Sequence, residues 1–231
     1  MSNIPTVEPP GSQAHATAAA GSVPVPPFPG PRVTGLCLVA GPVLALIGTV
    51  LGIDSYRAKG ADFVAAMVAH PDGFGWAVQI ALASMVLTLV AVGGLAAMIT
   101  ARTPGWGRTA GVVTMIGLCG PISFESVYWA ASKITDTAAH RAAAATLIDQ
   151  SQIIPRSVMN VTGPCLVVGF ILLGIAAAKS GVLDRPRAIL LGLTCLIPAG
   201  FISGHLVISA VAFACTCVAL VPLGLRVLQT R

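Results

Sequence analysis

Six apolar stretches, each of about membrane-spanning length, fill most of this chain and limit it to one class of fold. The hydrocarbon core of a bilayer needs about 20 apolar residues as a helix, and a helix satisfies its own backbone polar groups inside lipid. The sequence therefore predicts an all-α protein, a six-helix transmembrane bundle. The predicted spans are Val33–Ile53, Gly75–Thr100, Thr109–Ala131, Val158–Ala178, Ala188–Gly204 and His205–Leu225.

The low charge content excludes a large aqueous domain. Only 9% of the residues are charged and 55% are hydrophobic, whereas soluble domains carry about 25% charged residues. The net charge of +5 comes from basic residues scattered at span ends, the pattern that orients membrane proteins. We therefore expect membrane lipids as surroundings and no nucleic-acid partner.

The chain divides into a tail and the bundle. Residues 1–31 hold eight prolines and one charged side chain, Glu8. A segment of this composition cannot bury a core, so we expect a disordered, proline-rich cytoplasmic tail. Residues 32–231 form the predicted bundle, and its first apolar run is too long for a signal peptide.

Basic residues set the predicted orientation in the cell membrane. With six spans, the side that holds both termini carries eight basic residues and the other side five, which places both termini in the cytoplasm. Two long loops then lie outside. Ala61–His70 has apolar residues at helical spacing and Ala138–Ile148 is rich in alanine, so both predict short helices on the outer surface.

The last two spans depend on one turn. Arg187 and Arg226 enclose a segment without formal charge that is too long for a single crossing. Ser203–His205 offers the only plausible hairpin. The alternative is one span plus a re-entrant segment, which would put the C-terminus outside.

Small residues are spaced for close helix contact, either inside the bundle or between protomers of a homo-oligomer. These small-xxx-small pairs are Gly48 with Gly52, Gly107 with Gly111, and Gly200 with Gly204.

One segment occurs twice. Val33–Gly41 and Val161–Gly169 are identical at seven of nine positions, and they begin spans that run in opposite directions. A 3+3 inverted repeat of a transporter would produce this pattern, and so would chance, because apolar segments share their composition.

Glu125 is the strongest candidate for chemistry. It lies about one helical turn inside the aromatic pair Tyr128 and Trp129, and an ionisable residue within a span is a functional hypothesis by default. As a buried acid it would be a proton donor, the catalytic general acid of a membrane enzyme. As a structural residue it would reach interfacial water or pair with Lys133 or Arg57.

Other polar residues are expected at the same depth and form the candidate ligand-binding set. They are Asp54, Gln79, Asn160 and His205. The histidines of the outer loops have no ligand-like spacing, so no metal site is predicted. No nucleotide-binding or hydrolase motif stands where such a motif could work, and no cofactor is predicted.

Two resemblances complete the sequence reading. The chain resembles small polytopic membrane proteins of unknown function from high-GC bacteria, and this resemblance implies a six-helix bundle. It rests on the proline-rich tail, the stretch Ala61–Asp72 and the closely spaced last spans. Glu125 in its aromatic setting resembles the acid of small membrane-embedded terpene cyclases, which implies protonation of a prenyl chain.

Three functions remain open from the sequence. The first is a non-enzymatic bundle that binds an apolar small molecule or an envelope partner. The alternative is a terpene-cyclase-like membrane enzyme acting on a lipid or isoprenoid, with Glu125 as general acid. The third is a small transporter, which requires the inverted repeat to be real.

Overall fold

The computed structural model describes residues 30–52, 60–69, 71–151, 154–203 and 205–229, and these residues form helices and turns without a strand. Residues 1–29 of the predicted tail (residues 1–31) and Asp54 lie outside the described residues, and Pro31 already belongs to the first helix. The elements are α1 Pro31–Leu51, α2 Gly60–Ala69, α3 Pro71–Thr100, α4 Pro104–Ser132, α5 Ala138–Ser151, α6 Ile154–Ser180, α7 Arg185–Gly192, η2 Leu193–Leu196, α8 Ile197–Ser203 and α9 Leu206–Gln229.

Five of these helices are long and apolar enough to cross a membrane. They correspond to α1, most of α3, α4, the C-terminal part of α6, and α9. Prolines mark two of their starts, since Pro31 and Pro104 stand in the first turns of α1 and α4, where a missing backbone N–H costs nothing. Within the described residues the protein is thus an all-helical bundle of the membrane class.

The expected span Ala188–Gly204 is not one uninterrupted helix. The chain here forms α7, the 3-10 turn η2 and α8 in succession. Pro198 explains the interruption, because it has no N–H for the carbonyl of Thr194 and its ring crowds that carbonyl. The expected hairpin is found: α8 ends at Ser203 and α9 begins at Leu206.

Hydroxyl groups of α9 attach the interrupted segment to the bundle. The Thr216 hydroxyl donates to the Ala212 carbonyl at 2.9 Å and lies 2.7 Å from the Thr194 hydroxyl. Because a hydroxyl carries one proton, Thr194 is the donor between the two threonines. Ser209 donates to the carbonyl of Ile197 at 2.9 Å, so α9 bonds both to the 3-10 turn and to the start of α8.

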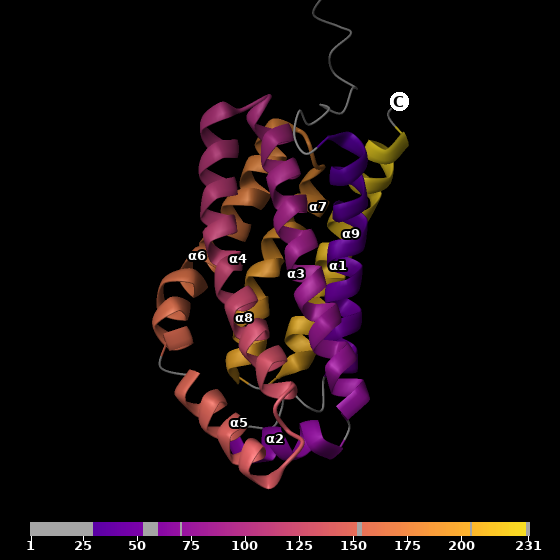
Figure 1. Ribbon diagram of the computed structural model, residues 1–231. Helices are drawn as coiled ribbons and strands as arrows, with labels where there is room; N and C mark the ends of the chain where they lie inside the picture. The colour runs from indigo at the N-terminus through magenta and orange to yellow at the C-terminus, as the bar shows by residue number, and fades with distance from the viewer. Residues whose placement is uncertain (1–29, 53–59, 70, 152–153, 204, 230–231) are drawn as a thin grey trace, which may run out of the picture.

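The helices run lengthwise along the bundle (Figure 1), and their contacts close into a ring. Along the chain, α1 packs on α3, α3 on α4, α4 on α6 and α6 on α7. Helix α9 packs on both α7 and α1 and so closes the ring. Interior side chains fill the ring. The largest of them, all less than 2% exposed, include Leu38, Leu95, Met98, Ile99, Leu173, Leu191 and Leu220.

Glycines let neighbouring helices approach closely. A Cβ on Gly117 of α4 would overlap the backbone of Leu166 on α6, and a Cβ on Gly169 of α6 would lie 2.6 Å from Cα of Thr114 on α4. Of the small-xxx-small pairs, Gly107 and Gly111 both pack against α3. This pair is therefore used inside one chain, and the homo-oligomer stays a prediction.

The duplicated segments do not make equivalent contacts. Gly41 of the first copy packs on Thr88 of α3, the next long helix along the chain. Gly169 of the second copy packs on Thr114 of α4, the preceding long helix. An inverted repeat would place both on the following helix, so these contacts do not favour one.

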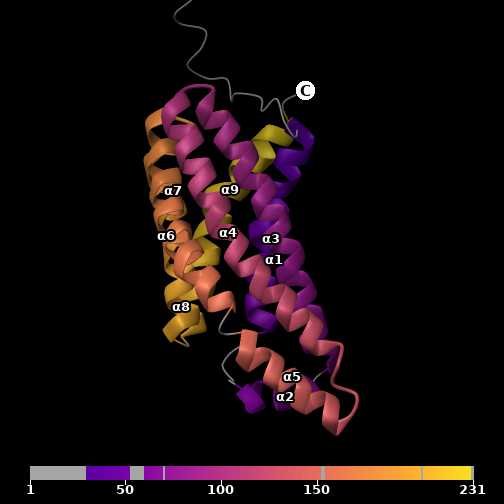
Figure 2. The same cartoon turned by 60° about the vertical axis from the view of Figure 1, so that its left-hand side comes forward.

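The two short helices form a cap at one end of the bundle, which Figure 2 shows beyond the ends of α3 and α4. Phe63 of α2 packs edge-on against Phe74 of α3, with ring centroids 5.2 Å apart, and lies 4.9 Å from the ring of Tyr128 on α4. Ala144 and Ile148 of α5 complete this second core. The cap is therefore packed onto the spans through buried aromatic contacts.

The first residues of α1 and the last of α9 lie at the end opposite the cap, together with the α3–α4 and α6–α7 turns (Figure 1). Arg102 joins these two turns: its Nη1 donates to the carbonyls of Ser180 and Gly181 at 3.1 and 3.2 Å.

Candidate functional site

Glu125 lies inside the bundle, at the wall of a small void. The residue is 7% exposed, and the void is lined by residues of five helices. They are Ala45, Gly48 and Thr49 of α1, Ala81, Ser84 and Met85 of α3, Glu125 of α4, Phe201 of α8 and Phe213 of α9. The inward orientation that its position predicts is found.

Small residues create this void. Gly48 approaches α3 so closely that a Cβ there would lie 3.3 Å from the backbone nitrogen of Ala81. Ala45 and Ala81 also line the void. The carboxyl group of α4 therefore faces a seam of short side chains, and the two phenylalanines form the remaining walls.

Two hydroxyl groups share the void with Glu125. Thr49 donates to the carbonyl of Ala45 at 2.9 Å and Ser84 to that of Ala81 at 2.6 Å. Each hydroxyl has only one proton, so toward the void both present oxygen lone pairs. The wall is polar at three points and apolar elsewhere.

The void is small. It has about 10 Å³ of space for the centre of a water molecule, which admits about one water. A prenyl or acyl chain has no room beside Glu125 in this arrangement. The role of Glu125 as a general acid stays a prediction.

The other candidate ligand-binding residues lie elsewhere. Gln79 of α3, Asn160 of α6 and His205 before α9 are all exposed, and none of them lines the void. The structure does not bring these three together with Glu125, whereas Thr49 and Ser84, which the sequence reading did not single out, stand beside it. Among the described residues, no three His, Cys, Asp or Glu side chains gather in a way that could hold a metal.

A larger groove lies on the cap, between α2 and α5. It has a volume of about 470 Å³ and is open to the surface. Six of its seven lining residues are valine or alanine, and the seventh is Arg141: Val64, Ala65, Val68, Ala69, Arg141, Ala142 and Ala145. Ligand pockets of about 300–1,000 Å³, mostly apolar with a few polar groups, are typical of small-molecule sites.

Arg141 is held at this groove by the chain just before its own helix. Its Nε donates to the carbonyl of Thr135 at 3.1 Å, and it takes part in neither of the two ion pairs of the described residues. One charged group in an otherwise apolar groove would orient a ligand with an acceptor at one end.

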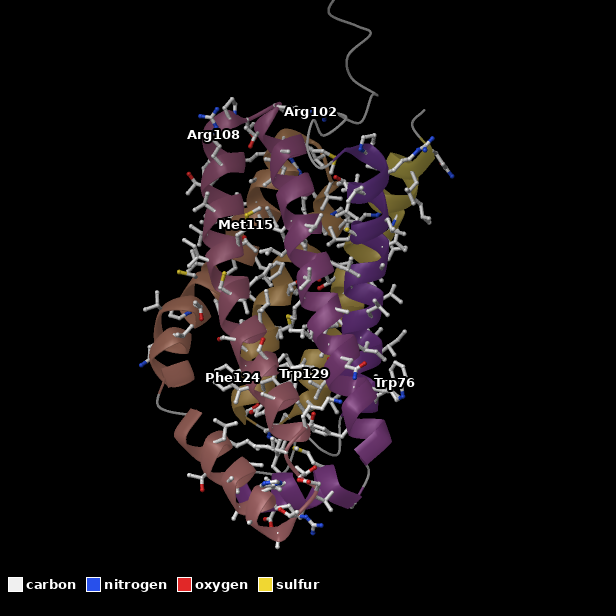
Figure 3. The ribbon with its side chains drawn as sticks, viewed as in Figure 1. Trp76, Arg102, Arg108, Met115, Phe124 and Trp129 are labelled. Carbon is white, nitrogen blue, oxygen red and sulfur yellow. The ribbon has the colours of Figure 1, made fainter. Side chains whose placement is uncertain are left out.

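Exposed tryptophans mark the level between this cap and the spans. Trp76 is 64% and Trp129 42% exposed, and Figure 3 shows both near the cap, far from Arg102 and Arg108 at the other end. Such tryptophans sit at the membrane–water interface. The groove of the cap is formed by α2 and α5, which are not among the five helices long and apolar enough to cross a membrane.

Comparison of this chain with protein-family models, with curated proteins and with solved structures gives no match.

Proposed function

We propose that this chain is a non-enzymatic, multi-pass protein of the cell membrane whose cap binds an apolar ligand in the groove between α2 and α5. The observation that carries the proposal is the contrast between the two hollows. The interior void at Glu125 has room for about one water, whereas the cap groove has about 470 Å³ and an apolar lining.

The proposed ligand is an apolar molecule with one hydrogen-bond acceptor or anionic end. The valines and alanines of the groove would cover its apolar part, and the Arg141 guanidinium would bind its polar end. The membrane-enzyme alternative is less well supported, because the void that Glu125 lines is too small for a lipid chain. The other possible occupant of the cap is an envelope protein, and copurification distinguishes it from a small molecule.

Filling the groove tests the proposal. Ala145→Trp, on the groove, is expected to reduce the amount of copurifying apolar molecules at least severalfold, because an indole ring would occupy the space. Mass spectrometry of organic extracts of the purified protein measures this. The matched control is Ala143→Trp. Ala143 lies two residues before Ala145 on α5, is exposed and does not line the groove, so no loss is expected.

The outcomes are distinct. Equal ligand content in both variants would overturn the groove as a ligand site. Loss of a copurifying protein, with no small molecule in either sample, would favour the envelope partner instead.

We also propose six membrane crossings with both termini in the cytoplasm. The segment α7–η2–α8 extends about 30 Å by helical rise, close to the thickness of the apolar core, and Figure 1 places α7 and α8 toward opposite ends of the bundle. The basic bias of eight to five supports the side.

Reporter fusions test this topology. A reporter that is active only in the cytoplasm is expected to work when fused after Arg231 and to fail when inserted between Ser203 and His205. A periplasmic C-terminus would contradict both the sixth crossing and the assigned side.

A further inference from the structure

A second groove lies at the end of the bundle opposite the cap. It has a volume of about 300 Å³ and runs between the first turns of α4 and the last third of α6, lined by Gly105, Trp106, Thr109, Ala110 and Leu172. Its lining is apolar apart from the Thr109 hydroxyl. Because α4 and α6 are both membrane-span candidates, this groove faces lipid at the edge of the membrane.

An ammonium group stands at the rim of this groove. Nζ of Lys179 lies 3.9 Å from the centroid of the Trp106 ring, a cation–π contact that fixes its position. Lys179 follows Leu172 by seven residues, about two helical turns, so both lie on the same face of α6. Lys179 is exposed and takes part in neither ion pair of the described residues.

The surrounding charge at this end is strongly positive. Asp184 is its only carboxylate among the described residues, and it lies 3.5 Å from Nε of Arg187. Arg102 adds a guanidinium at the end of α6, bonded to backbone carbonyls. The basic residues of this end are Arg32, Arg102, Arg108, Lys179, Arg185, Arg187 and Arg226.

We propose that this α4–α6 groove binds one anionic phospholipid, with the phosphate on the Lys179 ammonium and an acyl chain against Trp106 and Leu172. Three features of the groove match this occupant: an apolar floor that continues into the membrane, an interfacial tryptophan, and a cation that pairs with no carboxylate of the described residues. Basic pockets between spans on the cytoplasmic side favour anionic lipid headgroups for the same electrostatic reason. This site is independent of the ligand proposed for the cap.

Native mass spectrometry of the full chain in detergent tests the proposal. The protein is titrated with phosphatidylglycerol and with phosphatidylcholine of the same acyl chains, and the first lipid adduct is quantified. Phosphatidylglycerol is expected to bind the more tightly. Lys179→Gln should weaken it about fivefold, as expected for one basic residue near an anionic lipid surface, and leave phosphatidylcholine unchanged.

Three further variants separate the groove from the general charge of this end. Thr109→Trp keeps every basic residue but fills the groove, and it should weaken binding of phosphatidylglycerol at least as much. Lys179→Arg keeps the charge and should retain binding. Arg226→Gln removes an exposed charge of α9 at the same end and should have no effect on the first adduct.

Several results would overturn the proposal. Equal weakening by Arg226→Gln and Lys179→Gln would mean a diffuse surface charge. Full binding in Thr109→Trp would exclude the groove, and displacement of the lipid by inorganic phosphate alone would mean an anion site without a lipid. A melting temperature measured for each variant identifies any that fail to fold, and Lys179→Arg then keeps the proposal testable.

Discussion

Replacing Gly117 with alanine is expected to lower the melting temperature of the detergent-solubilised protein by on the order of 6 °C. The added Cβ would overlap the backbone of Leu166, so α4 and α6 must move apart. Overpacking of this kind costs about 3 kcal/mol, and alanine regains only roughly 1 kcal/mol through its better helix propensity. Thermal unfolding followed by tryptophan fluorescence measures the difference.

The matched control is Gly163→Ala on α6. Nothing lies within 4 Å of a Cβ at this position, so only the propensity gain remains and the melting temperature should stay the same or rise. If the two variants shift the melting temperature alike, the close contact of α4 with α6 is wrong.

The spans were predictable because apolar length is a direct physical requirement of lipid. α3, α4 and α6 contain the expected stretches, and α1 and α9 cover theirs except for one or two residues at one end. The break after Ser203 was marked by the one polar interruption in a long uncharged segment. The interruption of the next-to-last span was less visible. A proline in a span indicates that the helix can deviate there, but whether Pro198 bends the helix or goes with a 3-10 turn depends on its neighbours.

The close contact of α4 with α6 was not visible in the sequence. The motifs singled out there were glycine pairs four residues apart, whereas the tight α4–α6 contact uses Thr114 with Gly117 and Leu166 with Gly169, both spaced by three. A glycine in an apolar span is common, so its spacing does not say which partner helix it faces. That information exists only in the packed bundle.

The candidate site was predictable in part for a similar reason. The depth of Glu125 and its inward direction follow from its helix, because a carboxylate facing lipid is unfavourable. Its neighbours do not follow, since they depend on the rotation of other helices. Gln79 and Asn160 have a suitable depth but are exposed, while Thr49 and Ser84 face the void.

Replacing Glu125 with alanine is expected to destabilise the protein by about 3 kcal/mol, on the order of 9 °C in melting temperature. The residue is 7% exposed, so removal of its side chain leaves space between α1, α3 and α4 that Phe201 and Phe213 cannot fill without moving. Thermal unfolding in detergent measures the loss.

Glu125→Gln separates the structural role of this residue from chemistry. Glutamine keeps the size and a polar end, so for a packed, non-enzymatic bundle it should cost less than about 1 kcal/mol and leave the copurifying molecules unchanged. Ser126→Ala, an exposed neighbour on α4, provides the baseline for a change of this helix. The opposite outcome would be a Glu125→Gln protein that folds but has lost an activity that converts a lipid. Because the void has room for about one water, that result would mean that the bundle opens to a wider conformation in which Glu125 acts as the acid.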